Sequence, residues 1–180
     1  MISEATTLEE LAVLISKALE GAGVLATLSG GAAVSIYSDN AYESADLDFV
    51  TSEQHKILKN IVAGLGFRQS ASLRLFEHPD IDWYVEFPPG PLGFGDKYVS
   101  AEDLPMLNTQ HGPLRIITPT LSILDRLAAF WYHNDRQTWD QAVEVAKRQK
   151  IDWDYVYAWA RSERQDRSDI DKLRELAGVA

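Results

Sequence analysis

Residues 28–50, LSGGAAVSIYSDNAYESADLDFV, hold the two motifs around which this chain is expected to fold. The first is the pair Gly30-Gly31, which follows an apolar run that predicts a buried strand over residues 24–28. Residues 32–37 then predict a short helix. A glycine turn between a strand and a helix leaves main-chain N–H groups open at the positive helix end, where phosphate binds well. The sequence therefore predicts a phosphate cradle at the two glycines.

The second motif is the triplet Asp46-Leu47-Asp48, which lies in another predicted strand. Alternate residues of a strand share a face, so both carboxylates point the same way, while Leu47 and Phe49 point into the core. Paired carboxylates beside a phosphate cradle are what magnesium-dependent phosphoryl or nucleotidyl transfer needs.

LSGG followed by SADLDFV resembles the signature of the DNA polymerase beta nucleotidyltransferase superfamily, especially the minimal bacterial members that include toxins of abortive-infection systems. The resemblance covers about residues 24–136. It implies an α+β fold (an α/β nucleotidyltransferase fold), with a small mixed or antiparallel sheet, helices packed on one face, and a C-terminal helical segment. It also implies transfer of a nucleoside monophosphate from an NTP to an acceptor hydroxyl. Two Mg²⁺ or Mn²⁺ ions would assist, and pyrophosphate would leave.

The same resemblance assigns roles to individual side chains. Asp46 and Asp48 would bind the metal, and a third carboxylate is expected on a neighbouring strand. Residues 72–77 and 81–87 predict an antiparallel hairpin, and Glu86 in YVEF fits the third position better than Asp82, which lies near the turn. Both acids could instead simply be solvent-exposed polar residues on one face of the strand.

Nucleotide phosphates would be held by residues from both halves of the chain, namely Ser29, Gly30, Gly31, Arg126 and Arg136. Relatives present a basic residue, usually Lys, from a helix that here carries Asp125-Arg126. Arg126 could equally pair with a carboxylate on its own helix or on a neighbouring one.

From residue 119 onward, the chain changes to helical periodicity. We expect residues 1–118 to form the nucleotidyltransferase core and residues 119–180 to form a helical C-terminal segment packed on it. The pair Thr118-Pro119 predicts the start of the first of these helices, and a second is expected over residues 138–150. Asp152 is expected to cap a third helix that runs through residue 161, and Ser168 a short last one. The aromatic residues of this segment fit a helical core better than a base-stacking pocket.

Composition narrows the possible partners. The net charge of −10 argues against a broad nucleic-acid surface, and the absence of cysteine fits a reducing cytoplasm. The sequence shows no apolar run long enough to span a membrane and no signal-peptide pattern, so no membrane partner is expected. The acceptor stays open between a tRNA end, a protein hydroxyl and a small hydroxylated molecule.

Three features depart from the superfamily pattern. Ala32 stands where many relatives have Ser or Thr, the spacer between Gly31 and Asp46 is slightly long, and no lysine takes the phosphate-facing helical position. The first alternative is therefore a catalytically inactive binding or regulatory protein of a toxin–antitoxin pair, acting on a partner protein. The second is a metal-dependent glycosyltransferase, which the short chain and the glycine turn disfavour.

Overall fold

The computed structural model describes residues 2–70 and 72–178. Its strands and helices have the following bounds: α1 Leu8–Gly21, β1 Thr27–Ser29, α2 Gly30–Tyr37, β2 Asp46–Val50, α3 His55–Ala63, β3 Arg68–Gln69, β4 Leu75–Glu77, β5 Tyr84–Glu86, β6 Leu92–Phe94, β7 Lys97–Val99, β8 Met106–Thr109, β9 Gly112–Arg115, α4 Pro119–His133, α5 Gln137–Arg148, α6 Trp153–Ser162 and α7 Arg167–Leu176. A short 3₁₀ turn covers Ala101–Asp103.

One mixed sheet organises the first two thirds of the chain. Its strand order is β1-β2-β5-β4-β3, and only the central pair β2 and β5 runs parallel. Two hairpins, β6–β7 and β8–β9, lie outside this sheet. The expected small mixed sheet with packed helices is therefore confirmed, and so is the hairpin of β4 and β5.

The apolar residues of the central strands explain why this sheet is stable. Leu47, Phe49, Phe76 and Val85 are completely buried, which places the alternate residues of β2 and β5 on the opposite face. The sequence pattern had predicted this division for Leu47 and Phe49. Polar side chains at positions 46, 48 and 86 are consequently left on the face that the core does not cover.

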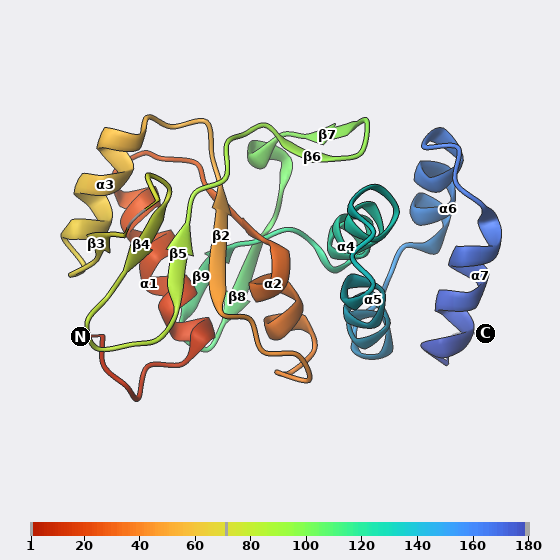
Figure 1. The fold of residues 1–180 in the computed structure, drawn as a ribbon, viewed down its shortest axis with the longest axis horizontal. Coiled ribbons are helices and arrows are strands. Elements are labelled where there is room, and N and C mark those ends of the chain that lie inside the picture. Colours follow the sequence, from red (N-terminus) through yellow and green to blue (C-terminus); the bar gives the residue numbers. More distant parts are fainter. Residues whose placement is uncertain (1, 71, 179–180) are drawn as a thin grey trace.

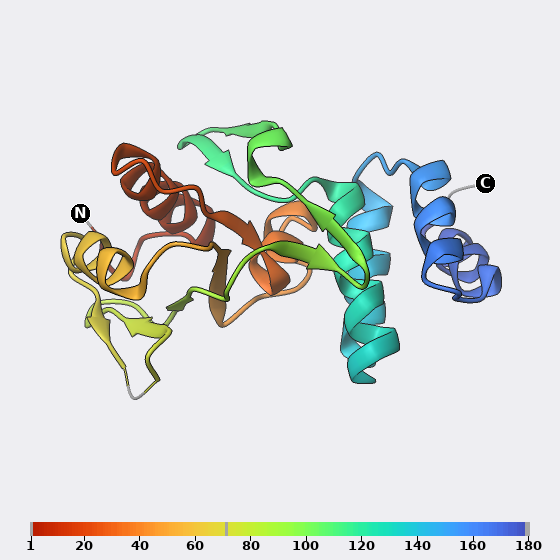
Figure 2. The ribbon, with the colours of Figure 1, turned by 90° about the horizontal axis from the view of Figure 1, so that it is seen from above.

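The four C-terminal helices follow one another away from the sheet, first α4 with α5 and then α6 with α7 (Figures 1 and 2). Helix α4 begins at Pro119, where the Thr118 hydroxyl accepts a hydrogen bond from the Leu121 amide. Helices α4 and α5 both contact α2, so the helical segment meets the sheet unit beside the glycine turn. Among the described residues, no helix is both long and apolar enough to cross a membrane.

Several local expectations need correction. Helix α2 begins at Gly30 rather than Ala32, and the first strand covers residues 27–29 rather than 24–28. The last helix is capped by Asp166, not by Ser168, because the Asp166 carboxylate accepts from the Ser168 amide. The short strands β3, β6 and β7 were not predicted, since two or three residues carry too little periodicity to reveal a strand.

Candidate active site

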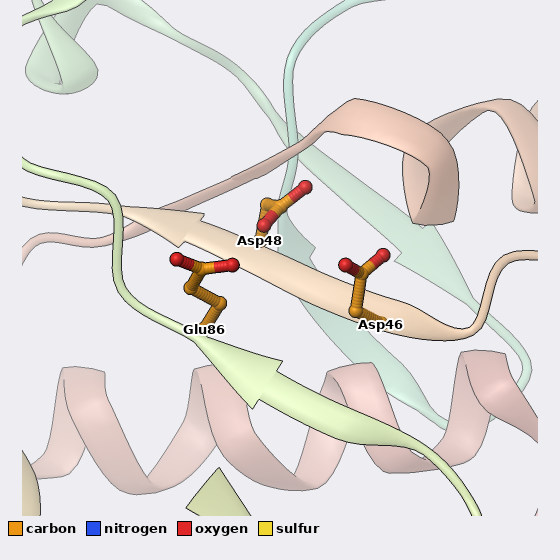
Figure 3. A group of neighbouring side chains, drawn as sticks. All are labelled: Asp46, Asp48 and Glu86. Carbon is orange, nitrogen blue, oxygen red and sulfur yellow. The ribbon is translucent and has the colours of Figure 1, made fainter. Parts of the chain in front are cut away.

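Three carboxylates meet on the face of the sheet opposite Leu47 and Phe49, and Figure 3 shows them side by side. Asp46 and Asp48 project from β2, and Glu86 projects from β5. In the parallel pairing of these strands Glu86 is the register partner of Asp48, so both side chains stand on one face. One oxygen of each residue lies within 4.8 Å of the corresponding oxygens of the other two, and all three residues are half-buried.

Such a cluster fits a divalent cation of the Mg²⁺ type. The ligands are hard carboxylate oxygens, and their charges face one another at short range. The pKa of Asp48 is raised to about 7, first by burial and then by the negative charges of Asp46, Glu86 and Asp125. Arg126 acts in the opposite direction. The positive charge of Arg126 therefore does not offset burial and the three neighbouring acids, and a bound cation would supply further positive charge.

Asp82 takes a different place from Glu86. It precedes β5 and lines a surface hollow of about 200 Å³ together with Arg68 and Trp83. The structure thus brings Glu86, and not Asp82, to the two aspartates.

The glycine turn lies directly against these acids. Gly30 has a φ of +64°, and a Cβ atom at this position would lie 2.3 Å from the Asp48 Oδ2. Both the left-handed backbone and the close approach of Asp48 therefore require glycine here. Gly31 is restricted by another neighbour, because a Cβ there would lie 2.6 Å from the Ser44 Oγ.

Ser44 is a site residue that the sequence did not reveal. Its hydroxyl lies 3.1 Å from the Asp46 Oδ1 and 2.9 Å from the Asp46 main-chain oxygen, so it can donate to either. The Ser44 amide donates to the hydroxyl of Ser35, which in turn donates to the Gly31 carbonyl. This chain of bonds joins helix α2 to the start of β2 and restrains the Asp46 carboxylate.

Helix α4 adds a fourth carboxylate and a cation. Asp125 Oδ2 accepts hydrogen bonds from the Gly30 amide at 3.2 Å and from Arg126 Nη2 at 2.7 Å. Arg126 Nη1 also donates to Gln141 Oε1 on α5 at 2.9 Å. The pairing of Arg126 with a carboxylate on its own helix, one of the two alternatives from the sequence, is therefore present. The sequence had placed Asp125 beside Arg126 without giving it a role.

The remaining predicted phosphate contacts differ in position. Ser29 ends β1, opposite Asp48 in the antiparallel register, and its hydroxyl makes only a long contact of 3.5 Å with the Asp48 carbonyl. Arg136 is exposed at the start of α5. Among the described residues, no hydrogen bond or ion pair joins Arg136 to the acidic cluster.

Comparison with known proteins supports the fold. No protein-family model and no curated protein sequence matches this chain. The solution structure of the antibiotic-resistance factor ANT(2'')-Ia superposes with a TM-score of 0.50 at 16% identity, over 94% of this chain and 91% of that protein. An antigenic nucleotidyltransferase-like protein from Paracoccidioides brasiliensis gives a TM-score of 0.53 at 14% identity, over 80% of this chain and 77% of its own. The chain therefore shares the fold of nucleotidyltransferases.

Proposed function

We propose that this protein is a nucleotidyltransferase, which moves a nucleoside monophosphate from an NTP to an acceptor hydroxyl and releases pyrophosphate. The observation that carries the proposal is the position of Asp46, Asp48 and Glu86, which converge beside a glycine turn in a nucleotidyltransferase fold. A pair of acids that is merely exposed to solvent gives no reason for a third carboxylate to converge on it from the adjacent parallel strand.

Each part of the site has a defined task in this scheme. Asp46 and Asp48 would hold Mg²⁺, or Mn²⁺, together with Glu86. When bound, the metal supplies charge neutralisation at the phosphates and a lowered pKa for a coordinated hydroxyl. Glu86 would also accept the proton of the acceptor hydroxyl as a general base.

The main chain of residues 29–31 would hold the terminal phosphates through N–H groups at the start of α2. Arg126 would add positive charge from α4, and its Nε atom is buried without a hydrogen-bond partner among the described residues. Arg136 would have to reach the nucleotide from the exposed start of α5. These phosphate-binding roles are assigned to residues of this chain from its resemblance to the superfamily.

The acceptor follows less directly from the site. ANT(2'')-Ia is described as an antibiotic-resistance factor, and this chain matches it over almost its whole length. A small hydroxylated molecule is therefore the first acceptor class to test, before a tRNA end or a protein hydroxyl. The alternative of an inactive binding protein is disfavoured by the acids themselves, because an unused cluster would keep its repulsion without benefit.

Calorimetry with each of the four NTPs, in the presence and absence of Mg²⁺, tests the proposal. We expect wild type to bind at least one NTP only with the metal, and Asp46→Asn/Asp48→Asn and Glu86→Gln to lose this binding. Asp82→Asn is the matched control, since it removes a charge next to the same strand but outside the cluster. Failure of wild type to bind any NTP with Mg²⁺ would refute the enzyme proposal. If wild type does bind an NTP with Mg²⁺, the same NTP in labelled form would identify the acceptor class among small molecules, tRNA and proteins.

A further inference from the structure

The Asp125 carboxylate takes a position that the proposed phosphate cradle itself needs. Its Oδ2 atom accepts from the Gly30 amide, although the two residues are 95 positions apart in the chain. A main-chain N–H carries a single hydrogen, so a phosphate oxygen and the Asp125 carboxylate cannot both receive it at full strength. Binding of phosphate at Gly30 therefore requires Asp125 to move away.

The Asp125 carboxylate also binds the guanidinium of the neighbouring Arg126. Arg126 directs Nη2 to Asp125 and Nη1 to Gln141, and only 13% of its side chain is exposed. In the free protein two of its five N–H donors are thus engaged, and the Nη2 group that points to Asp125 is not open to an incoming anion. Release of Asp125 would free the Gly30 amide and the Arg126 Nη2 group in one movement.

The electrostatic surroundings decide which ligand can cause this release. Four carboxylates, from Asp46, Asp48, Glu86 and Asp125, face one guanidinium, from Arg126. A phosphate that arrives without a cation meets net repulsion from this group. A phosphate that arrives with Mg²⁺ brings positive charge, which reduces its repulsion by the carboxylates.

We propose that Asp125 is a specificity-determining residue, whose carboxylate holds the Gly30 amide and Arg126 in the free protein and yields only to metal-complexed triphosphate. The inference rests on the proposed function and adds a selection step to its nucleotide site. Its consequence is that free inorganic phosphates are excluded from the cradle, while the magnesium complex of an NTP is admitted.

The test compares inorganic tripolyphosphate without metal, and ATP with Mg²⁺, on wild type, Asp125→Ala and Asp125→Asn. Loss of a competing charge-assisted hydrogen bond should tighten binding of metal-free tripolyphosphate about tenfold in Asp125→Ala. Asp125→Asn keeps an acceptor for the Gly30 amide but lacks the charge, so a smaller gain is expected. Asp154→Asn is the matched control: Asp154 is exposed on α6 and makes no side-chain hydrogen bond or ion pair within the described ranges.

The outcomes separate this inference from the proposed function. If wild type binds ATP with Mg²⁺ but the Asp125 variants bind tripolyphosphate no better, or more weakly, the selection role is wrong and the enzyme proposal stands. If the variants bind phosphates that wild type rejects, the role is supported. If no form binds any nucleotide with Mg²⁺, both proposals fall. A purely structural role of Asp125 would weaken binding with and without metal alike, and thermal unfolding of each variant checks that it is folded.

Discussion

Replacement of Asp48 by asparagine is expected to stabilise the metal-free protein at alkaline pH. The pKa of this carboxyl is raised from 3.8 to about 7, chiefly by burial and then by the neighbouring acids. The folded protein therefore binds a proton that the unfolded chain has released between these values, and stability falls as the pH rises through this range. Above pH 7 the accumulated cost is about 4 kcal/mol, from about three pKa units at 1.36 kcal/mol each.

Asparagine has nearly the same shape and carries no charge, so it removes this cost. We expect Asp48→Asn to raise the free energy of unfolding by about 4 kcal/mol at pH 8 and by about 2 kcal/mol at pH 5.5, where wild-type Asp48 is protonated in the folded state. Urea unfolding in the presence of a chelator, at both pH values, measures the two differences. The larger gain must appear at the higher pH.

In the presence of magnesium, wild type should have a higher free energy of unfolding than Asp48→Asn. Bound cation stabilises the folded state of wild type according to its concentration relative to the dissociation constant, and the variant lacks one of its ligands. A variant that is less stable than wild type at pH 8 without metal, or a gain that does not depend on pH, would refute the electrostatic account of this cluster.

Two further substitutions test the glycine turn and a hydrogen bond between α4 and the end of α6. Gly30→Ala should lower stability by about 1–2 kcal/mol through its positive φ and should also abolish magnesium-dependent nucleotide binding, because the new Cβ meets the Asp48 carboxylate; Gly23→Ala, with a φ of +73° and open space around it, should show the strain alone in urea unfolding. Glu163→Gln should lower the pKa of Tyr132, which is raised mainly by the hydrogen bond from its hydroxyl to the Glu163 carboxylate. Ultraviolet titration of the phenolate, with Tyr132→Phe as the reference that identifies this tyrosine, measures the shift; an unchanged pKa would show that the bond is absent in solution.

Local sequence patterns were sufficient for much of the fold. The alternation in DLDFV placed Leu47 and Phe49 in the core and both aspartates on the other face, because strand geometry forces this division. The pair Thr118-Pro119 marked the start of α4, because a capping hydroxyl and a ring-fixed φ both favour a helix there. Short strands such as β6 and β7 escaped prediction, since their pairing depends on partners rather than on their own periodicity.

The candidate site, like the fold, could be predicted only in part from the sequence. Asp46, Asp48 and the two glycines could be identified from their spacing, because they lie within one local motif. Glu86 was preferred over Asp82 through resemblance to relatives and because Asp82 lies near the turn, and the parallel register of β2 and β5 is what sets Glu86 opposite Asp48. Ser44 gave no signal, since a serine in a loop is ordinary turn chemistry.

The sequence by itself determined that this chain carries a glycine turn followed by paired carboxylates, since both features depend only on local backbone geometry. Only the tertiary structure decided which distant groups join them. The Asp125 carboxylate reaches the Gly30 amide across 95 residues, and no pattern along the chain encodes that contact. It arises because α4 packs against α2, and such packing is fixed by the shape and burial of whole helix surfaces rather than by any single motif.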